Sequence, residues 1–472
     1  MKKTFIVLIL LFLTFNLVYS QDFKKIDELS KQLMEKYHLP GIAIVGVKNG
    51  KIVYKFTSGK ANEDYDLSES SRIYIASNTK AFTGLALSKL AYENKINFSD
   101  PVSKYIPSSY FPANIEINKI TVRQLMQHTH GLSNDPLVFR TAYSGEYPSD
   151  LKELLKFTVY RLDSLSNEFH YSNLGYILGG IIIEQVTGKN WREYITDNIL
   201  KKIGMINSTA HMDFSSEEET LPFKYNSDVH LTSRKSENTL HAAGGIYSTL
   251  DNMSKWLALY TFNSPVPIGP KLLKLYLNDR VKVNKSMGPL SMDEYGNGWI
   301  SGSLMGNKLF FHFGSFYGYE SMMSFQPGQN DGVFVFVNEI TGGQRIAAMI
   351  TAYFYLIMSN DTDADSKIKM FTQFIDPLYK EDNAERKIFT FENSEKITGK
   401  YYSPEYGNLI VDKNTSGYTF RIGKLESIAY AGEKENEMII EFTPGIKEHF
   451  FITEDSGKTK LIYGDFGTFL KR

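Results

Sequence analysis

The chain has 472 residues and contains no cysteine. Disulfides, thiol nucleophiles, cysteine-ligated metal sites and lipid attachment to a cysteine are therefore excluded. A charge imbalance is lacking too, because 52 basic and 53 acidic residues give a formal net charge of −1 at pH 7. Nucleic-acid-binding proteins carry a clear basic excess, so we expect no nucleic-acid partner.

Long apolar runs are lacking except at the N-terminus. There, two lysines precede residues 5–18, which are almost entirely apolar but too few to span a bilayer as a helix. The residues before Gln21 suit cleavage by signal peptidase. We interpret residues 1–20 as a signal peptide, which predicts a secreted or periplasmic protein with no stable membrane span after cleavage. An uncleaved anchor is the alternative.

The remaining sequence changes character at about residue 360. Before it, over 21–360, a helix, two strands, a helical middle, three strands and a closing helix predict an α+β domain. In that domain an antiparallel sheet is flanked by helices and joined to an all-helical subdomain. Residues 361–388 are polar and acidic, and we interpret them as a linker. Short β-rich runs over 389–472 predict a small antiparallel β-barrel. The strands expected in the first domain are 42–47, 52–56, 309–313, 320–325 and 333–337.

The candidate catalytic centre begins with Ser77 and Lys80, a Ser-x-x-Lys pattern at the start of a predicted helix. Three residues apart on a helix, the two side chains lie on one face, one turn from each other. A serine hydroxyl is a weak nucleophile until a neighbour takes its proton, and a lysine with a lowered pKa can take it. Alone, the pattern is common, and an N-capping serine beside a solvated lysine is the alternative.

Two further motifs follow in order along the chain, Tyr171-Ser172-Asn173 and His312-Phe313-Gly314. Taken singly they are ambiguous, because Tyr171 is also a common core aromatic and Asn173 a typical N-cap. As an ordered set with Ser-x-x-Lys and the Gly-rich segment at Gly244, they resemble the penicillin-recognising serine hydrolases. That family includes class C β-lactamases, serine DD-peptidases, D-amino-acid peptidases and related esterases. The resemblance covers about residues 26–358 and implies a β-lactamase/transpeptidase-like fold.

The resemblance also implies a role for each residue of the set. Ser77 becomes acylated, Lys80 accepts or relays its proton, and Tyr171 completes the acid/base pair. The phenol would protonate the leaving group and later help to activate water. The substrate-binding residues so implied are Asn173, His312 and Gly314, and the backbone N–H groups of the oxyanion hole are those of Ser77 and Ser315. Neither a metal nor an organic cofactor is implied.

Two departures from the family pattern concern the substrate. His312 stands where class C β-lactamases carry a lysine, and a neutral imidazole is a weaker anchor for a carboxylate. Efficient β-lactam hydrolysis is therefore not expected. His130 stands where relatives usually have a small serine, so it either narrows the cleft or repacks a loop. With His128 it could suggest a metal site, but no third ligand follows at suitable spacing.

These residues predict a serine hydrolase that acts through an acyl-enzyme on D-amino-acid peptides or related amides, with cell-wall peptide as one candidate substrate. Carboxylic esters and β-lactams are alternative substrates. A non-catalytic penicillin- or peptidoglycan-binding protein is the alternative function. The C-terminal barrel resembles the lipocalin-like domain appended to some of these hydrolases. It either covers the cleft, aids oligomerisation or is a passive appendage.

Overall fold

The computed structural model describes residues 23–162, 167–215, 217–221, 235–261, 268–379, 386–391, 393–443, 446–455, 458–464 and 467–472. The expected signal peptide, residues 1–20, lies outside the described residues. Among the described helices, none combines the length and the apolar character that crossing a bilayer requires.

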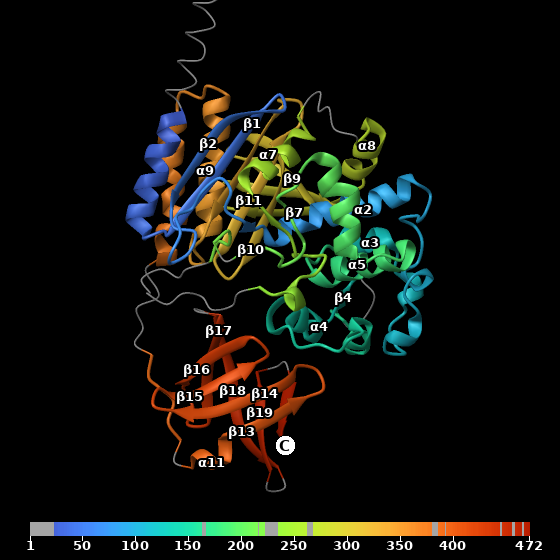
Figure 1. Cartoon of the computed structure of the whole chain (residues 1–472), viewed down its shortest axis with the longest axis vertical. Coiled ribbons are helices and arrows are strands. Elements are labelled where there is room, and N and C mark those ends of the chain that lie inside the picture. The colour runs from blue at the N-terminus through green and yellow to red at the C-terminus, as the bar shows by residue number, and fades with distance from the viewer. Residues whose placement is uncertain are drawn as a thin grey trace, which may run out of the picture.

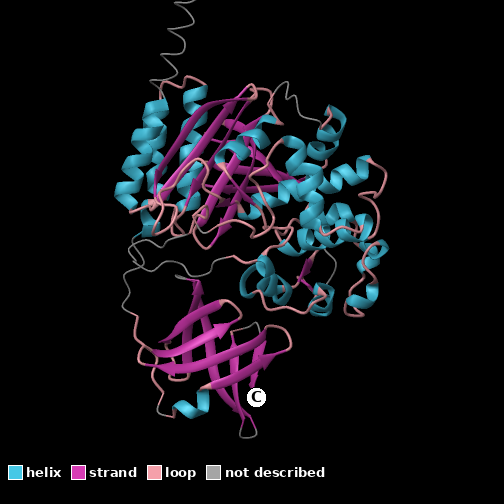
Figure 2. Cartoon of the chain, viewed as in Figure 1, coloured by secondary structure: helices cyan, strands magenta, loops and turns pink. Residues whose placement is uncertain are grey.

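An eight-stranded antiparallel sheet forms the centre of the first domain, in the order β2-β1-β12-β11-β10-β9-β8-β7 (Figures 1 and 2). All five expected strands are present, whereas β7, β8 and β9 were not expected. The strand bounds are β1 Gly41–Lys48, β2 Lys51–Gly59, β7 Val281–Met287, β8 Leu290–Gly296, β9 Trp299–Leu304, β10 Asn307–Phe316, β11 Tyr319–Gln326 and β12 Asp331–Val337.

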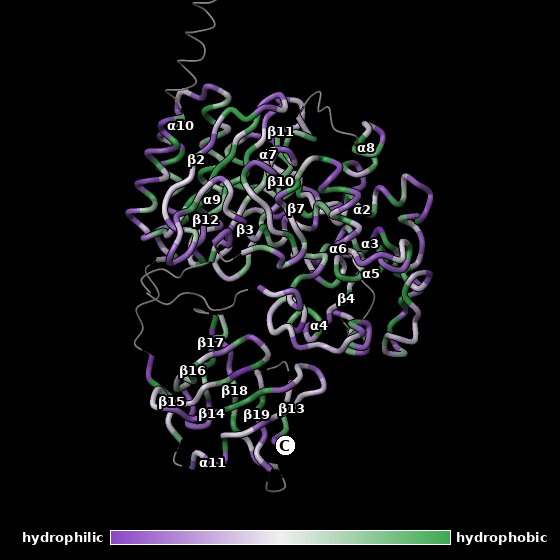
Figure 3. Tube along the Cα trace, viewed as in Figure 1, coloured by the Kyte–Doolittle hydropathy of each residue, from purple (hydrophilic) through white to green (hydrophobic). Residues whose placement is uncertain are grey.

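Helices cover both faces of this sheet. A helix over residues 23–37 and α9 lie together on one face, where the Phe23 and Phe354 rings stack with centroids 5.9 Å apart. α7 packs on the other face, and its Trp256 stacks on Phe82 of α2 at 3.8 Å. Figure 3 shows hydrophobic residues gathered along the central strands and the helices beside them. The helix bounds are α2 Thr79–Tyr92, α3 Val122–Met126, α4 Asp135–Phe139, α5 Asn173–Thr187, α6 Trp191–Ile195, α7 Leu250–Ala258, α8 Pro270–Asn278 and α9 Gly343–Met358.

The segment that we interpreted as a linker is structured over much of its length. Residues 364–371 form helix α10 (Ala364–Phe371), which buries Ala364, Ile368 and Phe371. These three side chains recur at helical spacing between the acidic residues, so the polar composition concealed an amphipathic helix. Tyr353 of α9 donates a hydrogen bond to Asp365, which ties α10 to the first domain.

A closed eight-stranded antiparallel barrel follows, in the order β13 to β20. It lies beside α4 and the adjoining helical turn η5 (Arg140–Ser144) of the helical subdomain (Figure 1). The Lys424 N–H donates to the Ser144 carbonyl at 3.0 Å, and the Phe139 and Tyr406 rings meet with centroids 5.5 Å apart. The strand bounds are β13 Gly399–Ser403, β14 Gly407–Asn414, β15 Gly417–Ile422, β16 Leu425–Ala431, β17 Glu437–Thr443, β18 Ile446–Asp455, β19 Lys458–Tyr463 and β20 Gly467–Lys471.

Candidate active site

Ser77 lies in a strained turn that leads into α2. The short strand β3 (Ile73–Tyr74) ends just before it, and the 3-10 turn η1 (Ala76–Asn78) runs directly into the helix. Ala76 has a φ of +45°, in the left-handed region that residues with a Cβ rarely adopt. Such strain persists only where neighbouring structure enforces it, and it is common beside catalytic groups. The turn leaves the Ser77 side chain partly accessible while its neighbours Asn78 and Lys80 are buried.

Strand β10 lies directly against this turn. β9 pairs with β10 only as far as Phe311, so the following residues of β10 have an open edge on that side. A Cβ at Gly314 would stand 2.2 Å from the Ile75 carbonyl oxygen, so only glycine permits this approach. Gly314 thus brings β10 close to the Ser77 turn, and its predicted substrate contact stays a prediction.

Lys80 is fully buried, and its ammonium nitrogen reaches three oxygens. Nζ lies 2.9 Å from Ser77 Oγ, 2.7 Å from Asn173 Oδ1 and 2.8 Å from the Ala243 carbonyl. Asn173 is free for this contact because Ser172 serves as the N-cap of α5, its hydroxyl accepting from the Leu174 N–H. Sequence reasoning did not identify Ala243, although the Gly-rich segment that carries it was recognised.

The chemistry of these three partners decides the direction of proton transfer. An amide oxygen and a backbone carbonyl only accept hydrogen bonds, so they take two N–H groups of the lysine. Burial lowers the pKa of Lys80 well below its usual value. The neutral amine then has one lone pair left, and Ser77 is the one partner with a proton to give. The geometry therefore supports Lys80 as the base that activates Ser77.

Tyr171 lies beside this pair. Its ring centroid is 4.9 Å from Lys80 Nζ. Tyr171 is 42% exposed. Burial around its phenol raises the pKa of Tyr171, and Ser77 opposes this shift only in part. A raised pKa favours the protonated phenol, which supports Lys80 as the group that takes the first proton.

His312 is 2% exposed, and both of its ring nitrogens have partners inside the protein. Nδ1 lies 2.6 Å from its neighbour's carbonyl, that of Phe313, and Nε2 lies 3.3 Å from the Tyr295 hydroxyl. Its ring centroid is 6.1 Å from that of Tyr171. Burial lowers the pKa of His312 to about 3, so the ring is neutral. His312 therefore borders Tyr171 from within the core, and its predicted substrate contact stays a prediction.

His128 and His130 support the local backbone. The His128 Nδ1 accepts the Ser172 N–H at 3.2 Å, which fixes the segment that carries Tyr171. His130 Nδ1 accepts the Leu132 N–H at 3.1 Å. His130 is buried against α5, so of the two expectations for this residue, loop repacking is the one that the structure confirms.

A cavity of about 320 Å³ adjoins Ser315 at the far end of β10. Ser315 donates its hydroxyl to Glu320 Oε1 at 2.8 Å, and burial raises the pKa of Glu320 well above its usual value. Ile446, from the first residue of barrel strand β18, also lines this cavity. Neither Glu320 nor the barrel residue was identified from the sequence, because nothing local marks them.

The model of the family described as Beta-lactamase matches residues 26–353. The chain belongs to the beta-lactamase family. Among curated relatives, "Protein flp" of Staphylococcus aureus (strain MW2) is 29% identical over 325 residues, which cover 67% of this chain and 63% of that protein. "Unguisins hydrolase ungD'" of Aspergillus campestris is 22% identical over 418 residues, covering 83% of this chain and 77% of that protein. The chain thus matches less than two thirds of the length of the staphylococcal relative.

Solved structures share the fold. The octameric penicillin-binding protein homologue from Pyrococcus abyssi is 21% identical with a TM-score of 0.60, covering 95% of this chain and 99% of that one. A class C beta-lactamase is 18% identical with a TM-score of 0.58, covering 72% and 96%. The D-amino acid amidase from Ochrobactrum anthropi SV3 is 18% identical with a TM-score of 0.57, covering 78% and 99%. The beta-lactamase family, to which this chain belongs, contains serine hydrolases and amidases.

Proposed function

We propose that the protein is a serine hydrolase that forms an acyl-enzyme on Ser77 and acts on D-amino-acid peptides or related amides. The observation that carries the proposal is the environment of Lys80. A buried amine with two pure acceptors and one hydroxyl neighbour is arranged to withdraw the proton of that hydroxyl.

Acylation follows from these contacts. The Ser77 proton moves to Lys80 Nζ as Oγ forms a bond to the substrate carbonyl carbon. The resulting oxyanion accepts the backbone N–H groups of Ser77 and Ser315, an interaction worth about 3 kcal/mol per donor where it has been measured in other enzymes. The ammonium of Lys80 then returns the proton through the Tyr171 hydroxyl to the leaving nitrogen, and the C–N bond breaks. Water enters and the same groups reverse their roles in deacylation.

An amide is favoured over an ester by the need for a proton at the leaving atom. An amine leaves only when protonated, whereas many alkoxide leaving groups tolerate partial protonation. Burial raises the pKa of Tyr171, which favours the protonated phenol, and its ring lies 4.9 Å from Lys80 Nζ, so it is placed to supply that proton. The D-amino acid amidase among the structural neighbours is consistent with this substrate class.

Secretion or periplasmic residence forms part of the proposal. It depends on the apolar N-terminal segment over residues 5–18, which follows two lysines. The intact mass of the protein recovered from its native host tests this part. We expect a mass that corresponds to a chain beginning at Gln21. Recovery of the full-length chain in the cytoplasm would contradict this part without affecting the hydrolase proposal.

The hydrolase proposal is tested by covalent labelling. Wild-type protein, Ser77→Ala and Ser88→Ala are incubated with a fluorophosphonate and with a fluorescent penicillin, and adducts are detected by intact mass. Ser88 is the matched control, because it is buried on the same helix and its hydroxyl has no hydrogen-bond partner. We expect an adduct in wild type and Ser88→Ala and none in Ser77→Ala.

A substrate panel then separates the alternatives. It contains D- and L-amino-acid p-nitroanilides, a D-Ala-D-Ala peptide, p-nitrophenyl esters and nitrocefin. Ser77-dependent turnover of the D-anilides above the esters and nitrocefin is expected. Saturable binding of these compounds that is unchanged in Ser77→Ala, without turnover in wild type, would establish the binding protein instead.

A further inference from the structure

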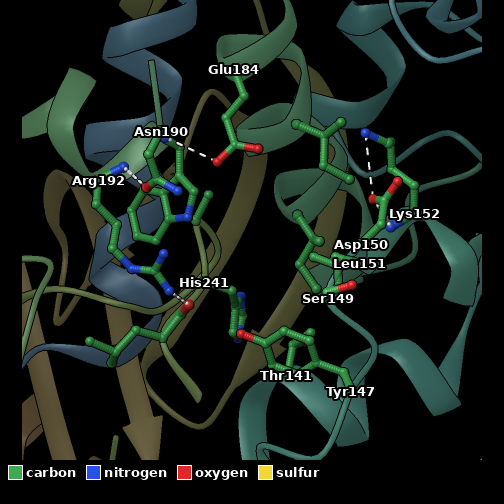
Figure 4. Close-up of a pocket in the computed structure, with 15 residues that line it drawn as sticks. Thr141, Tyr147, Ser149, Asp150, Leu151, Lys152, Glu184, Asn190, Arg192 and His241 are labelled. Atoms are coloured by element: carbon green, nitrogen blue, oxygen red, sulfur yellow. Dashed lines mark hydrogen bonds and ion pairs between the residues drawn. The ribbon is translucent and has the colours of Figure 1, made fainter. Parts of the chain in front are cut away.

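A second cavity, of about 210 Å³, lies within the helical subdomain; we call it the rear pocket. Its inner end is formed by buried residues of α5 and of the segment 240–242, and its mouth by partly exposed residues of the turns around Asp150 and Asn190. In Figure 4 the Glu184 carboxylate and the His241 ring both face this space. The rear pocket is thus open to solvent at one end and closed by His241 at the other.

The closed end of the rear pocket lies next to the backbone carbonyl that accepts a hydrogen bond from Lys80. His241 Nδ1 accepts the Ala243 N–H at 3.2 Å, and the Ala243 carbonyl accepts from Lys80 Nζ at 2.8 Å. Thr83 of α2 holds the residue between them by donating to the Ala242 carbonyl at 2.6 Å. The wall between the rear pocket and the active site is therefore a single hydrogen-bonded strand of backbone.

His241 presents an unused donor to the rear pocket. The ring is 6% exposed, and burial lowers its pKa well below the usual value, so it is neutral. Because Nδ1 accepts a hydrogen bond, the single ring proton of the neutral form lies on Nε2. No described residue accepts from Nε2. An oxygen atom of a ligand in the rear pocket would accept this N–H, an interaction worth about 0.5–1.5 kcal/mol.

The charged side chains that line the rear pocket balance in number, since it holds Asp150 and Glu184 as well as Lys152 and Arg192. Lys152 lies 3.5 Å from Asp150, and Arg192 lies 3.5 Å from Glu237, which is outside the lining. Glu184 accepts from the Trp191 N–H at 3.2 Å, and no described cation reaches it at ion-pair distance. Burial raises the pKa of Glu184, and the more distant charges of Arg192 and Lys152 oppose this shift. A cationic group on a ligand would form the close ion pair that Glu184 lacks among the described residues.

We propose that the rear pocket binds a small primary ammonium compound that carries a carbonyl or carboxylate oxygen, the class of a free amino acid or an amino-acid amide. The ammonium pairs with Glu184, the oxygen accepts from His241 Nε2, and an aliphatic side chain packs on Ile177 and Ile181. A cavity of roughly 150 Å³ accommodates benzene, so this one suits a molecule of about ten non-hydrogen atoms. Under the proposed function the ligand belongs to the product or substrate class of the enzyme, but the site itself does not depend on turnover.

The site is tested by isothermal titration with D- and L-leucinamide. The protein is used in two forms, unmodified and with Ser77 blocked by a phosphonate adduct, so that binding in the cleft is separated from binding in the rear pocket. N-acetyl-leucinamide, which lacks the ammonium, is the ligand control. Glu184→Gln keeps an acceptor for the Trp191 N–H, and the exposed Glu193→Gln on α6 is the matched protein control.

We expect the saturable site of the rear pocket in both forms of the protein, with binding or turnover in the cleft added in the unmodified form under the proposed function. Glu184→Gln and the acetylated ligand should each weaken binding at least about tenfold, while Glu193→Gln should not change it. Loss of binding upon blocking Ser77, or binding that Glu184→Gln leaves unchanged, would overturn the proposal. If no phosphonate adduct forms, the proposed hydrolase function fails, yet the comparison of Glu184→Gln with the wild type still tests the rear pocket. The ligand control needs no variant and therefore does not depend on correct folding of Glu184→Gln.

Discussion

Two buried lysines lie close to the active site, and their surroundings differ. Lys80 is held by Ser77, Asn173 and Ala243, all through oxygen atoms. Lys235 is 3% exposed; its ammonium nitrogen donates to the Ala142 carbonyl and lies 3.4 Å from the centroid of a phenylalanine ring, that of Phe316. Burial lowers the pKa of both lysines well below the usual value, and neither forms an ion pair with a described residue.

The comparison separates a lowered pKa from a catalytic role. Desolvation alone makes an amine a better base at neutral pH, and it acts on both lysines. Only Lys80 has a hydroxyl within 2.9 Å that can give up its proton. Lys235 instead lies over aromatic rings and donates to a carbonyl, and no hydroxyl of a described residue is hydrogen-bonded to it. The identity of the neighbours, rather than the pKa, assigns the base.

The strongest test of this comparison is Lys80→Met against Lys235→Met. Methionine keeps the volume of the aliphatic chain and removes the amine. Lys80→Met should lower the rate of acylation by about 10³-fold or more, because general base and nucleophile act together. Lys235→Met should leave it within about threefold. Stopped-flow labelling with the fluorophosphonate measures both, and equal losses in the two variants would abolish the distinction.

Tyr171→Phe gives the next largest expected effect. Because the phenol keeps its proton at rest, its removal should slow the step in which the leaving group is protonated. We expect kcat on D-anilides to fall about 10²-fold, with a smaller loss on p-nitrophenyl esters, whose leaving group needs no proton. Parallel kcat measurements on both substrate types check this. An identical loss on both would indicate that Tyr171 acts on Ser77 rather than on the leaving group.

The candidate catalytic residues could be predicted from the sequence because each of them lies in a short motif. Ser77-x-x-Lys80 and Tyr171-Ser172-Asn173 were both identified, and the structure brings Ser77, Asn173 and the Tyr171 ring to Lys80 Nζ. The sequence also located His312 and Gly314 on the strand beside Ser77, and their substrate contacts stay predictions. A motif fixes position along the chain, whereas the direction of a side chain depends on pairing with strands far away in the sequence.

Other features of the structure left no distinct local signal in the sequence. Ala243 acts through its backbone carbonyl, which any residue type could supply. Strands β7, β8 and β9 are polar on one face and short, so their period was not distinct from that of loops. The pattern over 364–371 was hidden by the acidic residues of α10. The domain boundaries proposed from the sequence stay predictions.

Gly314→Ala tests whether activity depends on the close contact between β10 and the Ser77 turn. The added Cβ would meet the Ile75 carbonyl at 2.2 Å, so β10 and the Ser77 turn must move apart. We expect about tenfold lower kcat and a loss of about 1–3 kcal/mol in the free energy of unfolding. Gly269→Ala, where no atom of a described residue lies within 4 Å of the added atom, is the matched control. Full activity in Gly314→Ala would show that the close approach of β10 is dispensable.

Lys235→Met has the smallest expected effect on activity but the clearest expected effect on stability. The folded protein holds this amine neutral, whereas the unfolded chain protonates it below its usual pKa of 10.5. The unfolded state therefore binds one more proton in that range, and wild-type stability rises with pH towards 10.5, by about 1.4 kcal/mol per unit for one proton.

Lys235→Met removes this term, so its Tm should exceed that of the wild type at pH 7, with the difference shrinking as pH approaches 10. Differential scanning calorimetry at pH 7, 8, 9 and 10 measures this, with the exposed Lys31→Met as control. Parallel Tm curves for Lys235→Met and wild type would mean that the lysine stays protonated among its aromatic neighbours, as a cation–π interaction would favour.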